Sequence, residues 1–127
     1  MTKTTVRPRR SPQLRLEIAG DRIAPSLQTR IAQRIRQTLV GVQTSPVHAR
    51  VTFADVNGPK GGVDIRCAIN VQIPRTAPLY ATAIADRHIT AFNRSADVIA
   101  RRIARQLSRR EESGRRPKKY YAARRLL

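Results

Sequence analysis

The feature that most constrains the fold is a strict alternation of apolar and polar residues between positions 47 and 73. Apolar side chains stand at every second position of residues 47–53 and again, without a break, of residues 63–73. Alternation with a period of two places the apolar side chains on one face of a β-strand. The connecting residues 55–62 contain Asn57, Pro59 and three glycines, which are typical of a turn. The pattern therefore predicts a β-hairpin with one buried face.

Two more strands and two helices are predicted around this hairpin. Residues 14–18 alternate in the same way, and a short strand is expected at 79–84 after a turn at 74–78. Apolar residues recur every four positions from 25 to about 40, and Gly41 follows them, which indicates an amphipathic helix and its end. A longer helix is predicted from about 86 to 112, where the apolar residues fall within an arc of about 80°. They are Ile89, Phe92, Ala96, Ile99, Ile103 and Leu107.

The predicted order of elements is β-α-β-β-β-α, which favours an α+β domain. The first strand, helix and second strand form a crossover, so these two strands are expected to be parallel, and the hairpins make the rest antiparallel. Each element has one apolar side. We therefore expect a four-stranded mixed sheet with two helices packed on one face, as in double-stranded-RNA-binding domains. The domain spans residues 13–112, with a disordered basic arm at 1–12 and a basic tail at 113–127.

Positive charge dominates the composition. The sequence has 26 Lys and Arg residues but only 8 Asp and Glu, which gives a formal net charge of +18. Self-repulsion of this size destabilises a compact chain, and a polyanionic partner relieves it. Only four of the basic residues are Lys, and the guanidinium group of Arg fits phosphate oxygens in a planar fork. The charge balance favours nucleic-acid binding over generic solubility.

The spacing places much of this charge on the two helices. On the long helix, arginines cover the side opposite the apolar stripe and form what we name the arginine ridge, namely Arg87, Arg94, Arg101, Arg102, Arg105 and Arg109. An ordinary solvated face usually mixes signs, but only Asp97 lies nearby before Glu111, so we expect the ridge to contact phosphates. Other candidate RNA ligands lie on the first helix, in the hairpin loop and in the tail. They are Arg30, Arg34, Arg36, Lys60, Lys118, Lys119, Tyr120 and Tyr121, where the tyrosine rings could stack on unpaired bases and the tail could equally be inert.

Catalysis is not expected, because acid–base chemistry needs His or carboxylates that converge. His48 lies on the polar side of a strand, His88 begins the long helix and the acids are scattered. Cys67 falls in the apolar alternation and is expected in the core, with no disulfide partner. No zinc spacing, cofactor motif or small-molecule site is recognised, and the glycine-rich loop lacks the full phosphate-binding pattern. The sequence has no bilayer-length apolar run and no secretory signal, so a cytoplasmic location is expected and no membrane.

Two stretches carry a resemblance to a known family. Residues 54–67 read ADVNGPKGGVDIRC and residues 91–107 read AFNRSADVIARRIARQL. Over residues 13–112 the chain resembles the bacterial ribosome hibernation promoting factors, also described as ribosome-associated inhibitors or sigma-54 modulation proteins, and in particular their short form. The loop at 57–62 with the following cysteine is the most specific piece.

The resemblance implies a translation inhibitor without catalysis. Members bind the 16S rRNA of the small ribosomal subunit between head and body, also in the 70S ribosome. They block mRNA and tRNA binding near the decoding centre in stationary phase or stress. The matching basic positions are Arg30, Arg34, Arg94, Arg101, Arg102, Arg105 and Arg109. Residues 89–93 depart from the Tyr-Ala-Ala-Ile-Asp-like run of the family, which leaves contacts at that helix start open. The segment after 112 is too short for the dimerising domain of long members, and a monomer is expected.

Two other hypotheses for the function remain open. The same fold could bind structured RNA in general, as an RNA chaperone or ribosome assembly factor. A modulator of transcription or of another acidic protein is the third hypothesis, suggested by the older name of the family.

Overall fold

The computed structural model describes residues 11–57 and 64–115 of the chain, with side chains to position 109. The elements follow in the order β1 (Leu14–Ala19), α1 (Pro25–Thr38), β2 (Val47–Asp55), β3 (Ile65–Gln72), β4 (Leu79–Ala85) and α2 (His88–Arg115). This order confirms the predicted β-α-β-β-β-α succession. The remaining residues, including Lys60, Lys118, Lys119, Tyr120 and Tyr121, lie outside the described residues, as do the basic arm 1–10 and most of the predicted tail.

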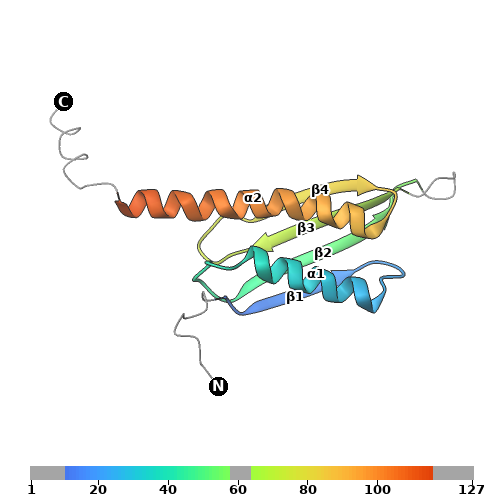
Figure 1. Ribbon diagram of the computed structural model, residues 1–127, viewed down its shortest axis with the longest axis horizontal. Helices are drawn as coiled ribbons and strands as arrows, with labels where there is room; N and C mark the ends of the chain where they lie inside the picture. Colours follow the sequence, from blue (N-terminus) through green and yellow to red (C-terminus); the bar gives the residue numbers. More distant parts are fainter. Residues whose placement is uncertain (1–10, 58–63, 116–127) are drawn as a thin grey trace, which may run out of the picture.

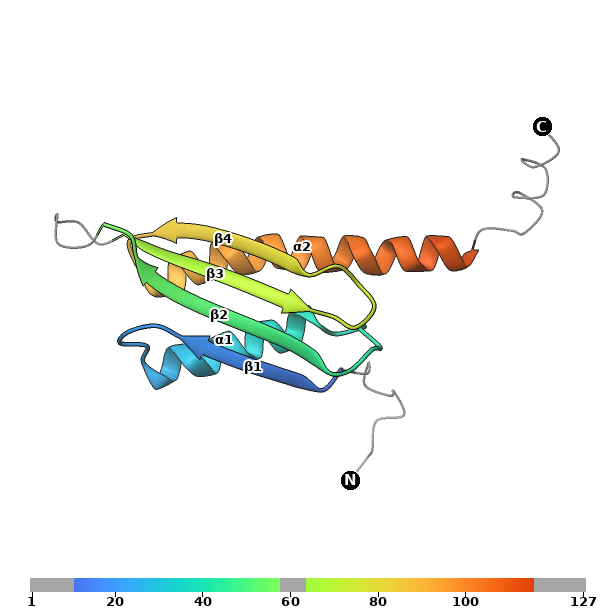
Figure 2. The same ribbon diagram turned by 180° about the vertical axis from the view of Figure 1, so that it is seen from behind.

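The four strands form one sheet in the order β1-β2-β3-β4. β1 runs parallel to β2, whereas β2 with β3 and β3 with β4 are antiparallel. Both helices cover the same face, α1 beside β1 and β2 and α2 along β3 and β4 (Figure 1). Seen from behind, the strands have no helix over them (Figure 2). The predicted α+β fold, a mixed sheet with two helices on one face, is thus confirmed.

The core lies between the sheet and the helices and consists mainly of aliphatic side chains. Every second residue of β2 and β3 points into it, and Val47, Val51 and Ile69 are fully buried. Ile31 and Ile35 fill it from α1, and Phe92 from α2. Burying a side chain of this size contributes about 1.5–3 kcal/mol, so this layer contact is what holds the helices to the sheet.

The long helix ends later than the sequence predicts. The expected boundary lies near 112, before Ser113 and Gly114, but α2 continues to Arg115. A glycine in a helix costs only about 1 kcal/mol relative to Ala, and the preceding residues Arg109 to Glu112 have good helix propensity. The helix therefore extends three residues into the segment predicted as tail. The first helix ends at Thr38, two residues before the predicted end near 40, and Gly41 follows with a backbone φ of +97°, a conformation that favours glycine.

Cys67 is a core residue, as the alternation predicts. Its side chain is completely buried, and the hydroxyl of Ser95 on α2 donates a hydrogen bond of 2.8 Å to the Cys67 carbonyl oxygen. Burial raises the pKa of the Cys67 thiol to about 12, and the Ser95 hydroxyl opposes this only partly. The thiol therefore stays protonated at neutral pH and is unsuited to nucleophilic attack.

This buried thiol makes stability sensitive to alkaline pH. The ordinary thiol pKa is 9.0, so above pH 9 the unfolded chain loses a proton that the folded chain keeps until about pH 12. The free energy of unfolding should then fall as pH rises, by up to about 1.4 kcal/mol per pH unit. We expect urea denaturation at pH 8 and pH 10 to show a larger loss for the wild type than for Cys67→Ala. Equal losses in the two proteins would contradict the assignment.

Candidate nucleic-acid interface

The arginine ridge lies on the exposed side of α2. The apolar stripe of the helix is fixed against the sheet by Phe92, Ile99 and Ile103, each at most 1% exposed, so the opposite side faces outward. Arg101, Arg105 and Arg109 are exposed there, and no acidic side chain pairs with any of the three in residues 11–57 and 64–109. Their charges are therefore not neutralised within the described part of the domain.

Two other members of the ridge are already engaged by the protein itself. Arg94 Nη1 donates a 3.0 Å hydrogen bond to the carbonyl oxygen of Ile84, and Arg102 donates one to the carbonyl oxygen of Tyr80. Both acceptors belong to β4, the outer strand beside α2. These guanidinium groups keep further N–H donors and remain exposed, but their positions are fixed toward the sheet edge.

Arg34 lies in a different setting from the one expected. Its guanidinium Nη2 stands 2.8 Å from Oδ1 of Asp97 and joins α1 to α2. Asp97 therefore neutralises an arginine of the neighbouring helix, and Arg34 is half-buried rather than free. Arg34 is thus placed less well for a phosphate than the unpaired arginines.

The three remaining predicted arginines of the described residues are exposed. Arg30 lies on α1, Arg36 in its last turn and Arg87 directly before α2. Neither an ion pair nor a side-chain hydrogen bond involves any of the three within the described part of the chain. Together with the ridge they give the helix side of the domain a basic surface carried by both helices.

A hollow beside α2 was not foreseen from the sequence. It encloses about 310 Å³ between the β3–β4 turn and the helix. Its lining combines Ala77, Leu79 and Gln106 with Arg102, Arg105 and Arg109. Three guanidinium groups around one hollow are suited to an anion such as a phosphate. The sequence did indicate that these arginines lie together, because residues spaced three and four apart share a helix face.

In the described segments, no three His, Cys, Asp or Glu side chains are grouped so that they could hold a metal ion. No helix among the same residues is both long and apolar enough to cross a bilayer.

Fold and charge together define a basic α+β domain with an arginine-rich helix surface. Among solved structures, the fold is similar to the N-terminal domain of Protein Y from Thermus thermophilus, with a TM-score of 0.58 and 15% identity over 73% of this chain and 97% of that domain. A ribosomal subunit interface protein from Coxiella burnetii aligns with a TM-score of 0.44 and 15% identity over 76% of this chain and 97% of its own. No family model and no curated protein sequence matches the chain. The similarity to the Thermus domain shows the fold and is consistent with the resemblance to the hibernation promoting factors.

The contact between the two helices gives a testable prediction. The Arg34–Asp97 pair is partly solvated, so its coupling should be only about 0.5–1 kcal/mol and should weaken in salt. A double-mutant cycle with Arg34→Gln and Asp97→Asn, read by urea denaturation in 50 mM and 500 mM salt, measures it. A coupling energy near zero at low salt would mean that the pair does not form in solution.

Proposed function

We propose that this protein binds the rRNA of the small ribosomal subunit and inhibits translation by steric occlusion. The unpaired arginines of the ridge and of α1 hold RNA phosphates, and the body of the domain occupies space near the decoding centre that mRNA and tRNA otherwise use. No bond is made or broken. The protein acts as a cytoplasmic monomer in stationary phase or stress, and it leaves the ribosome when growth resumes.

The observation that carries this proposal is the unpaired state of Arg101, Arg105 and Arg109. Like charges one helical turn apart repel each other, and nothing in the described part of the domain neutralises these three. A row of phosphates would offset the repulsion and release bound counterions. The hollow lined by the same helix gives one such phosphate a defined place.

The choice of the ribosome among structured RNAs is supported by the family resemblance. The loop ADVNGPKGG and the arginine-rich helix sequence resemble those of the hibernation promoting factors. The fold agrees with that of the Protein Y N-terminal domain. The departures at residues 89–93 concern the start of α2, whereas the arginines that carry the proposal lie two to four turns later.

Sedimentation of ribosomes tests the proposed partner. The purified protein should co-sediment with small subunits and with 70S ribosomes at about 50 mM salt and dissociate at several hundred mM, because phosphate contacts dominate its affinity. A protein that stays in the supernatant at low salt would refute the proposal. Excess tRNA and mRNA should displace it. Binding to the ribosome that survives this competition would favour a general binder of structured RNA instead.

The ridge can be tested with variants of equal charge. Arg101→Gln/Arg105→Gln should weaken binding to the small subunit about tenfold or more and lower the salt dependence by about two released counterions. Arg22→Gln/Arg75→Gln is the matched control, because it removes the same charge from exposed loop positions. The control should retain nearly all affinity. If both double variants lose affinity equally, the total charge matters and the ridge does not.

A further inference from the structure

The face of the sheet that no helix covers is a second surface with its own chemistry (Figure 2). Strand register arranges its side chains in rows across the sheet. One row runs over all four strands, from Glu17 to Arg50, Asn70 and Tyr80. The neighbouring row contains Arg15, His48 and Gln72. These seven residues come from four separate segments, and only the register brings them together.

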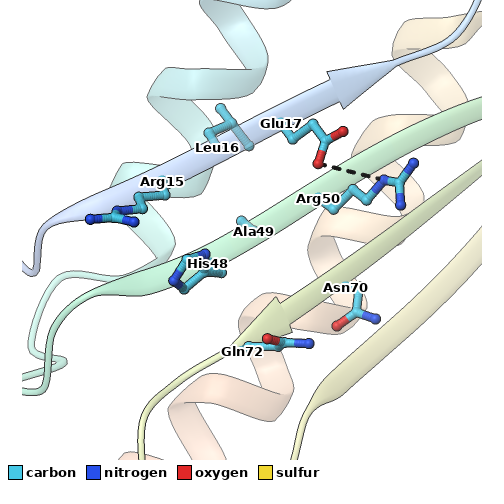
Figure 3. A pocket seen from close by; sticks show the side chains of 8 residues that line it. All are labelled: Arg15, Leu16, Glu17, His48, Ala49, Arg50, Asn70 and Gln72. Atoms are coloured by element: carbon cyan, nitrogen blue, oxygen red, sulfur yellow. Dashed lines mark ion pairs between the residues drawn. The ribbon is translucent and has the colours of Figure 1, made fainter.

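A shallow hollow of about 430 Å³ lies between these rows, a size within the range of ligand pockets. Its lining is drawn in Figure 3, where Arg15 and His48 stand beside each other on β1 and β2 and the amides of Asn70 and Gln72 lie together on β3. Tyr80 follows Asn70 on the outer strand with 52% of its surface exposed. The floor is formed by the strands themselves, so a flat group can lie directly against the sheet.

The charge of this face favours an anionic occupant. Arg15, Arg50 and Arg66 point outward on it. Glu17 is the one acidic residue of the two rows, and its Oε2 lies 3.8 Å from Nε of Arg50. A pair at this distance between exposed groups is weak, so a phosphate competes readily with the carboxylate.

The uncharged side chains specify the occupant further. Asn70 and Gln72 each carry both a donor and an acceptor, as the edges of nucleobases require. The side-chain oxygen of Asn70 is buried against the sheet and accepts no hydrogen bond from any described residue, so this amide is not yet satisfied within the domain. His48 and Tyr80 offer rings on which bases stack. Duplex RNA hides the Watson–Crick edges and the faces of its bases, whereas a single strand exposes both, and other four-stranded sheets bind single strands in this way.

A second copy of this chain fits the face poorly. Sheets that pack face to face interdigitate apolar side chains, but among the described residues the large apolar side chains exposed on this face are only Tyr80 and Ile84, both on β4. Arginines of the two copies would also face each other across such an interface and repel. The surface is too polar for burial and too basic for self-association.

We propose that the uncovered face of the sheet binds single-stranded RNA, with His48 and Tyr80 stacking on bases, Asn70 and Gln72 contacting base edges and Arg15 and Arg50 holding phosphates. This surface is separate from the arginine ridge. One domain then contacts structured RNA on the helix side and an unpaired strand on the sheet side. The inference does not require the ribosome, because it concerns the form of RNA and not its source.

Fluorescence anisotropy with two labelled probes tests this inference, namely a single-stranded oligoribonucleotide of about ten mixed nucleotides and a hairpin with a fully paired stem. For the full-length protein, His48→Ala/Tyr80→Ala should raise the Kd for the single strand about tenfold or more, since each lost stacking contact is worth a severalfold change at least. The Kd for the hairpin should change less than twofold. Tyr80→Phe, which keeps the ring, should restore most of the single-strand affinity lost in Tyr80→Ala.

Two controls separate this inference from the proposed function. Ile84→Ala removes an exposed apolar side chain from the same face of β4 and should leave both affinities unchanged, and melting curves confirm that each variant is folded. Arg101→Gln/Arg105→Gln should weaken the hairpin and spare the single strand. Unchanged single-strand affinity in His48→Ala/Tyr80→Ala would overturn the sheet-face proposal alone, whereas failure to bind ribosomes would overturn the proposed function alone.

Discussion

The direction of the arginine ridge depends on the contact between the apolar stripe of α2 and the inner face of β3 and β4. Phe92, Ile99 and Ile103 are buried almost completely in that contact. Turning the helix about its axis by one residue would expose them, at a cost of several kcal/mol. The rotation of α2 is therefore fixed, and with it the direction in which the arginines on its other side point. In the sequence these arginines are only spaced periodically. The packing of the helix places them together on one defined surface.

The same contact explains how the domain tolerates its charge. The inner faces of the strands and helices carry the cohesive free energy, and the cations lie at the greatest distance from them. Within the described residues, two acidic side chains form ion pairs, one between the helices and one on the open face of the sheet. Neither neutralises the outer arginines. The free protein thus retains electrostatic repulsion among these arginines, and the proposed binding of RNA would relieve it.

The sequence predicted the elements, the sheet and the core well, because each strand or helix shows its period in single side chains such as Val51, Ile69 or Phe92. It predicted less well the contacts that long side chains make with residues of other helices or strands. Arg34 meets Asp97 and Arg102 meets Tyr80 only because the fold places segments far apart in sequence within reach. The rows on the open face depend on strand register, which alternation alone does not reveal. The hollow beside α2 needs both the helix and the β3–β4 turn. What the sequence predicts for residues 58–63 and for the two ends of the chain stays a prediction.

The hydrogen bonds from Arg94 and Arg102 to β4 have a consequence for how the sheet ends. An outer strand presents backbone groups that template the addition of another strand, which is the route to fibrous aggregation. Here the carbonyl oxygens of Ile84 and Tyr80 are already occupied by guanidinium groups. An incoming strand would have to displace them and to approach two positive charges. Part of the arginine content therefore opposes strand addition at this edge, and it lies on the same helix as the arginines proposed to contact RNA.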